Sequence, residues 1–292
     1  MRRTGIFVAA AVSVALLSAG CKKTGTPTGP SPTPAPNSTI GYTALGASDV
    51  IGFGASSFCI PYDDCANGKG YVQVAARDLR GRGFTVKVNP LGLPGAVLSR
   101  RILNLGVKYG RKDLLANIME QEIPFILPTS TLITIFAGGN DVNVITTALG
   151  GGAGGADRPG YINSEVALFG QDFTAALQAI RERAPAARII VLNLPNLGAM
   201  PFLANAPRDH RLAAQMLSVG ITKTVYNPLT SSGVMVLDLM CDARSYQAST
   251  YSGDGFHPSD IGYAWIAAEV VAATTTAYRA PAATCPPMTS VQ

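Results

Sequence analysis

Ser48, Asp254 and His257 are the residues of this chain whose types and spacing best suit nucleophilic chemistry. A serine hydroxyl is a weak nucleophile unless a base takes its proton, and histidine is the natural base because it exchanges protons near neutral pH. Asp254 precedes His257 by three residues in "SGDGFHPSD", so its carboxylate can accept a hydrogen bond from the second ring nitrogen. Singly, each is also an ordinary turn or helix-cap residue. Together they indicate acyl transfer through a serine.

Five short apolar runs predict the strands that must position these groups: residues 42–46, 84–89, 132–138, 188–195 and 233–240. Helices are expected around 70–80, across 97–120 with a break, and at 164–184, 207–225 and 259–279. The middle three runs are almost continuously apolar, which is typical of parallel strands buried on both faces. The pattern predicts an α/β fold, a three-layer α/β/α sandwich around a mainly parallel five-stranded sheet of flavodoxin-like order.

Polar groups follow four of these elements at the carboxyl edge of the predicted sheet, where ligands of such folds bind. The segments are "GASD" with Ser48, "NPLGLPGA" with Gly95, "AGGND" with Asn140, and "SGDGFHPSD" with Asp254 and His257. One such segment would be chance, but four segments distant in the sequence predict a single site.

With these four segments in this order, residues 40–280 resemble the GDSL or SGNH hydrolase family of serine esterases and lipases. The resemblance implies that Ser48 is the nucleophile, His257 the base and Asp254 its partner. It also implies an oxyanion hole made by the backbone N–H groups of Ser48 and Gly95 and the side-chain amide of Asn140. One position departs from the family pattern, because Ala47 stands where the family has an aspartate. How the nucleophile loop is held is therefore an open question.

The resemblance implies a carboxylic ester hydrolase that uses no cofactor and no metal. Its substrate would be a small-molecule, lipid or sugar ester. One alternative is a non-catalytic surface lipoprotein of the same fold that binds a glycan or lipid, and another is transfer of the acyl group to an alcohol. A zinc site is not expected, since the chain has only two histidines. Asp141, next to Asn140, is assigned a structural role.

The N-terminus predicts export. Residues 1–20 form a signal-peptide pattern in which two arginines precede an apolar run. The following "LLSAGC" resembles a lipobox, which would make Cys21 the lipidated residue; the alternative is cleavage near Ala19 with Cys21 incidental. Residues 21–39 are then a Pro/Thr-rich tether and 40–292 the hydrolase domain. The expected location is the cell envelope, as a lipoprotein anchored at the outer membrane or periplasmic face, or else the secreted fraction.

An even number of cysteines follows Cys21, which in an exported chain indicates two disulfides rather than four free thiols. The expected pairs are Cys59–Cys65, around a short loop, and Cys241–Cys285, between a strand end and the C-terminal tail.

The formal net charge is +5, and loss of Arg2 and Arg3 would leave 21 basic against 18 acidic residues. With no cluster of lysine and arginine, this balance excludes a nucleic-acid partner. The glycine-rich residues 149–160 follow no strand directly, so a dinucleotide site is not expected. They are interpreted as either a flap over the site or a passive connection.

Overall fold

The computed structural model describes residues 32–114, 116–276 and 278–292. The expected signal peptide, Cys21 and the first part of the tether lie outside these residues. The centre is a five-stranded parallel sheet in the order β2-β1-β3-β4-β5. Its strands are β1 (Thr39–Gly46), β2 (Thr85–Pro90), β3 (Leu132–Phe136), β4 (Arg188–Leu192) and β5 (Met235–Leu237). The predicted fold class and strand order are confirmed.

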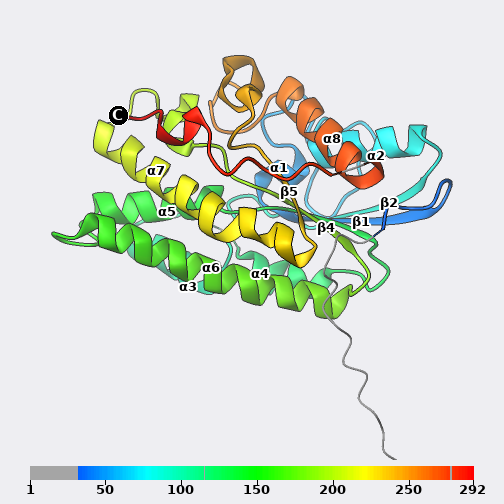
Figure 1. Ribbon diagram of the computed structural model, residues 1–292, viewed down its shortest axis with the longest axis horizontal. Coiled ribbons are helices and arrows are strands. Elements are labelled where there is room, and N and C mark those ends of the chain that lie inside the picture. The colour runs from blue at the N-terminus through cyan, green and yellow to red at the C-terminus, as the bar shows by residue number, and fades with distance from the viewer. Residues whose placement is uncertain (1–31, 115, 277) are drawn as a thin grey trace, which may run out of the picture.

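Helices cover both faces of the sheet, as Figure 1 shows. Helices α2 (Tyr71–Gly81) and α8 (Asp260–Thr275) pack together on one face. The other face carries α3 (Arg100–Lys108), α5 (Gly139–Gly150), α6 (Arg158–Arg183) and α7 (Arg208–Ile221). The short helix α1 (Ser48–Ile51) follows β1, and the short helix α4 (Ile118–Gln121) precedes β3. None of the helices in the described residues is both long enough and apolar enough to cross a membrane.

Strand side chains alternate between two buried cores. In β1, Tyr42 and Ala44 enter the core beneath α2 and α8, whereas Leu45 enters the core beneath α3, α5, α6 and α7. In β4, Ile190 and Val191 divide in the same way. Because both faces are covered, apolar residues can follow one another along the strand without exposure. This is the physical reason for the continuous apolar runs in the sequence.

Several element ends differ from the sequence-based expectation, helix α5 is not among the expected helices, and two of the differing ends have a clear local cause. Helix α6 begins at Arg158, ahead of the expected start at 164, because Asp157 caps it by accepting the backbone N–H of Gly160 at 2.9 Å. The "DRPG" stretch is thus a helix start, where proline is well tolerated, and not a turn. Strand β5 ends at Leu237, short of the expected 240, because the Asp238 carboxylate accepts the backbone N–H of Cys241 at 3.1 Å and turns the chain.

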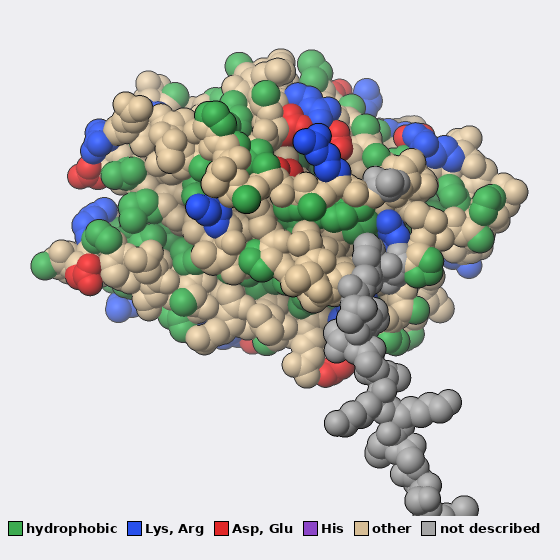
Figure 2. Space-filling view, in the orientation of Figure 1, with side chains coloured by type: hydrophobic (Ala, Val, Ile, Leu, Met, Phe, Trp, Pro, Cys, Tyr) green, Lys and Arg blue, Asp and Glu red, His purple; other side chains and the backbone are tan. Residues whose placement is uncertain are grey.

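Charged side chains of both signs are mixed on the surface. On the face in Figure 2, blue lysine and arginine side chains lie in small groups, several of them beside red acidic ones. Arg244, for example, contacts Asp242 at 2.6 Å and Glu269 at 2.8 Å. This face therefore presents no broad basic surface.

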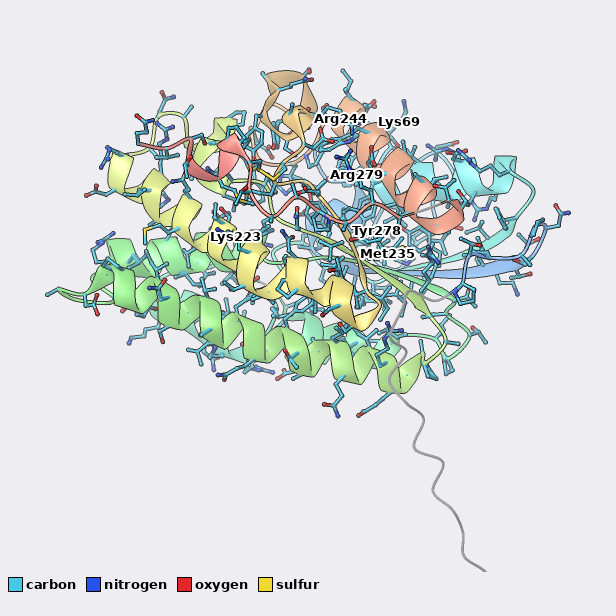
Figure 3. All side chains as sticks on the ribbon, in the orientation of Figure 1. Lys69, Lys223, Met235, Arg244, Tyr278 and Arg279 are labelled. Atoms are coloured by element: carbon cyan, nitrogen blue, oxygen red, sulfur yellow. A yellow bond between two sulfur atoms is a disulfide. The ribbon has the colours of Figure 1, made fainter. Side chains whose placement is uncertain are left out.

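The cysteines form the two expected disulfides, Cys59–Cys65 and Cys241–Cys285. The second ties the segment after β5 to the C-terminal segment, which returns along the sheet. There the Tyr278 hydroxyl accepts the backbone N–H of Val236 at 2.9 Å and donates to its carbonyl at 3.1 Å, and Figure 3 shows Tyr278 beside Met235. The C-terminal segment is thus fastened to the edge strand β5 at two points.

Removing the Cys241–Cys285 disulfide should lower the free energy of unfolding more than removing Cys59–Cys65. The sequence separations are 44 and 6 residues, and the longer loop loses more chain entropy when closed, a difference of about 1.5–2 kcal/mol. Denaturant unfolding of the Cys241→Ala/Cys285→Ala and Cys59→Ala/Cys65→Ala double variants tests this expectation. Equal losses, or a larger loss for the short loop, would contradict it.

Candidate active site

Ser48 lies where β1 gives way to a helix. The strand ends at Gly46, and Ser48 is the first residue of α1, which ends after one turn at Gly52. Because β1 lies between β2 and β3, its carboxyl end is the point at which connections leave in opposite directions, the usual ligand position in such sheets. Ser48 is a buried residue, 6% exposed, so it does not project into solvent.

The three residues identified from the sequence form one hydrogen-bonded chain. Ser48 Oγ lies 2.8 Å from His257 Nε2, and His257 Nδ1 lies 2.6 Å from Asp254 Oδ2. An ionised carboxylate can only accept, so Nδ1 carries the proton and Nε2 is free to accept from the serine hydroxyl. The imidazole is therefore oriented as a base toward Ser48.

Asp254 is fixed by its own turn. Its Oδ1 accepts the backbone N–H groups of Phe256 at 2.8 Å and His257 at 2.9 Å, and the Ser252 hydroxyl at 2.9 Å. Partial burial acts to raise the pKa of Asp254, but these bonds and the His257 side chain outweigh it and lower the pKa to about 2. The acid and the base thus come from one tight loop whose geometry is set by local hydrogen bonds.

Gly95 and Asn140 face the same open cavity of about 320 Å³ as Ser48 and His257. Gly95 needs a left-handed backbone (φ +74°), and a Cβ there would lie 2.4 Å from the carbonyl oxygen of Asp113. Asn140 is in the first turn of α5 and does not cap it, since the N-cap residue is Gly138. Its Nδ2 donates to the Ala96 carbonyl at 2.9 Å, which ties the amide to the residue after Gly95.

The described residues offer no acceptor for the backbone N–H groups of Ser48 and Gly95. Unpaired backbone N–H groups in a buried or partly buried place are uncommon. Both residues line the cavity that Ser48 and His257 face.

Sequence reasoning missed six residues that line this cavity, among them two aromatic residues and an ion pair. Phe53 and Phe256 pack their rings 4.8 Å and 5.0 Å from the His257 ring, and both face the cavity. Arg111 and Asp113 form a two-bond pair at 2.7 and 2.6 Å on the same wall. The aromatic residues flank motif positions and could have been noticed there. The "RKD" stretch carries no local signal, because only the fold brings it to the cavity.

Asp141 has the structural role assigned to it. Its buried carboxylate accepts the backbone N–H of Leu98 from both oxygens, at 3.0 and 3.3 Å, and so links α5 to the loop that follows β2. Burial raises the pKa of Asp141 to about 7, against the opposing effect of those bonds. Among residues with described side chains, no group of three or more His, Cys, Asp or Glu is placed to hold a metal ion.

The flap interpretation of residues 149–160 is wrong. Residues 151–157 of this segment join α5 to α6, its other residues belong to the ends of these two helices, and α5 is 12 residues long. At about 1.5 Å per residue the helix carries its far end about 15 Å from Asn140. The cavity lining contains no residue from this segment. It is a connection between helices at the end of α5 remote from Ser48.

Comparison with known proteins identifies the family. A model of the GDSL-like lipase/acylhydrolase family matches residues 44–265. The chain belongs to this family. It is therefore a serine ester hydrolase, as the four sequence segments predict.

Solved structures agree with this fold. The lipase Lip_vut3 from a goat rumen metagenome is 19% identical with a TM-score of 0.54, covering 81% of this chain and 98% of that one. An extracellular lipase from Streptomyces rimosus is 19% identical with a TM-score of 0.52, covering 81% and 100%. At this identity the likeness concerns the fold alone. Among curated proteins no match is found.

The low pKa of Asp254 gives the fold a pH dependence in acid. Its pKa falls from 3.8 to about 2 on folding, so the ionised form favours the native state above pH 4. That contribution disappears as the pH falls from about 4 to about 2. The melting temperature of Asp254→Asn, which cannot ionise, should therefore lie below that of the wild type at neutral pH and approach it in acid. A difference that stays constant from pH 6 to pH 2.5 in thermal melts would contradict this.

Proposed function

We propose that this hydrolase cleaves carboxylic esters through an acyl-enzyme on Ser48. The observation that carries the proposal is the hydrogen-bonded chain from Ser48 through His257 to Asp254, at 2.8 and 2.6 Å, beside an open cavity. In the first step His257 Nε2 takes the hydroxyl proton while Ser48 Oγ bonds to the ester carbonyl carbon. The carbonyl electron pair moves to its oxygen and produces a tetrahedral oxyanion.

The oxyanion would be held by the backbone N–H groups of Ser48 and Gly95 and the Asn140 amide. The two backbone groups have no acceptor within the described part of the chain, and the Asn140 amide has a second N–H besides the one bonded to Ala96. Donors already in place cost no rearrangement when the charge develops. Collapse of the oxyanion then breaks the bond to the alcohol oxygen, which leaves with the proton from the imidazolium.

Water completes the cycle. His257 takes a proton from water, the resulting hydroxide attacks the acyl carbon, and collapse returns the proton to Ser48 Oγ while the carboxylic acid leaves. Asp254 keeps Nδ1 protonated and stabilises the imidazolium in both halves. An alcohol in place of water would give acyl transfer by the same steps. The relay of hydrogen bonds supports catalysis over the alternative of a non-catalytic binding protein.

We also propose export and membrane tethering through Cys21, with residues 21–39 as the tether and 40–292 as the catalytic domain. The signal-peptide and lipobox patterns support this proposal, and so do the two disulfides, which persist in oxidising compartments. The first described strand begins at Thr39, next to the expected domain boundary.

Ser48→Ala should reduce hydrolysis of p-nitrophenyl acetate by at least about 10³-fold, because no other group can form the acyl-enzyme. Loss of one hydrogen bond costs about 1 kcal/mol, so the melting temperature should fall by only a few degrees. A fluorophosphonate probe should label the wild type and not the variant. Retention of more than a few per cent of wild-type turnover would refute the assignment.

His257→Ala should reduce kcat/KM at least as much as Asp254→Asn on one substrate. Without the imidazole the proton has no acceptor, whereas without the carboxylate the base is present but poorly oriented. The asparagine variant is the matched choice because its amide oxygen can keep the turn bonds of Oδ1. A greater loss in Asp254→Asn would mean that the two roles are assigned wrongly.

A further inference from the structure

Glu122 is a completely buried carboxylate that the proposed mechanism does not use. It lies between α4 and the short 3-10 helix at Ile123–Phe125, and its exposed fraction is 0%. Among the described residues no lysine, arginine or histidine lies within ion-pair distance of it. Burial raises the pKa of Glu122 well above its usual range, while two backbone N–H groups act in the opposite direction. A buried acid without a counter-ion is costly, so its bonds to those N–H groups have to offset that cost.

Those two bonds join the two loops that build the site. Oε2 accepts the backbone N–H of Gly46 at 2.9 Å, and Oε1 accepts that of Leu93 at 3.3 Å. Gly46 ends β1 two residues before Ser48, and Leu93 follows β2 two residues before Gly95. One carboxylate therefore spans from the nucleophile turn to the loop of the second oxyanion donor.

Glu122 joins the two loops at the point where the pairing of β1 with β2 ends. The last backbone hydrogen bond of this pairing runs from the N–H of Leu91, just after β2, to the carbonyl of Ala44 in β1, at 2.9 Å. Beyond it the loops still touch, because a Cβ on Gly92 would lie 2.5 Å from the Ala47 carbonyl oxygen and 2.3 Å from Val50 Cβ. Ala47 itself has no polar side chain to link them. Glu122 supplies the polar link from a third segment.

We propose that Glu122 is a positioning residue that holds the Ser48 and Gly95 backbone N–H groups at the separation the oxyanion requires. In this proposal Glu122 holds the nucleophile loop through Gly46, in place of a polar side chain at position 47, which is alanine in this chain. The proposal rests on the proposed function, since it assigns Glu122 to the oxyanion site of that reaction. Both Glu122 oxygens accept a backbone N–H in this arrangement, whereas a glutamine presents an N–H₂ donor to one of the two N–H groups.

Glu122→Gln tests the proposal when kcat is expressed per active serine. The fraction of molecules labelled at Ser48 by a fluorophosphonate counts the folded, competent sites, and kcat divided by that fraction removes any loss of folded protein. We expect kcat per site to fall about 10–100-fold, with KM changed by less than about 3-fold, because misaligned donors weaken binding of the transition state more than of the substrate.

Glu165→Gln is the matched control. Glu165 is also buried, with 6% exposure, but its carboxylate contacts Arg101 at 2.5 Å and neither loop of the site. Its kcat per site should equal that of the wild type. If too little Glu122→Gln folds to be measured, Glu122→Asp, which is too short to reach both N–H groups, should show an intermediate loss.

The outcomes separate the two proposals. An unlabelled and inactive wild type would overturn the proposed function. A labelled, active wild type with kcat per site unchanged in Glu122→Gln, even at reduced yield or melting temperature, would overturn the positioning role alone. The same loss in Glu165→Gln would overturn it as well, because the effect would then belong to any buried carboxylate.

Discussion

The parallel pairing of β1 with β2 on one side and β3 on the other is the constraint on which the site depends. It sends the loops after three adjacent strands out at the same edge. Ser48, Gly95 and Asn140 lie just beyond these strand ends, so neighbouring strands bring them together without any long side chain reaching across. The buried acids Glu122 and Asp141 then hold the loop that follows the edge strand β2, through the backbone N–H groups of Leu93 and Leu98.

The acid–base loop arrives by a different route. It precedes α8, and α8 is fastened to the nucleophile loop by its own side chains. Tyr263 donates to the Phe53 carbonyl at 2.7 Å, and the Asp260 carboxylate accepts the backbone N–H of Ser56 at 2.8 Å. The packing of α8 on α2 buries the apolar side of the same helix. His257 is therefore positioned by the docking of a whole helix as well as by its local turn.

Much of this could be predicted from the sequence because the informative signals are local. Apolar runs give strands, and the loops that follow them carry Ser48, Gly95, Asn140, Asp254 and His257 within short motifs. The start of α6 and the end of β5 depend on single hydrogen bonds accepted by Asp157 and Asp238. Aspartate is also common in ordinary turns, so the sequence alone does not locate these ends. Glu122 and Arg111 gain their meaning only from contacts with distant segments, and no pattern around them reveals those contacts. The flap interpretation failed because glycine content reports backbone freedom and not distance from the site.

Ser48 and His257 are separated by 209 residues along the chain, although their side chains touch. A polypeptide is made from its N-terminus, so the serine is present long before its base. Until α8 has docked, Ser48 lacks the imidazole that the proposed mechanism gives it as a base. Under that mechanism, a growing or partly folded chain cannot attack esters in its surroundings. For the same reason, the appearance of activity during refolding would report closure of nearly the whole domain, and a fragment ending before Asp254 would remain inert however well its sheet formed.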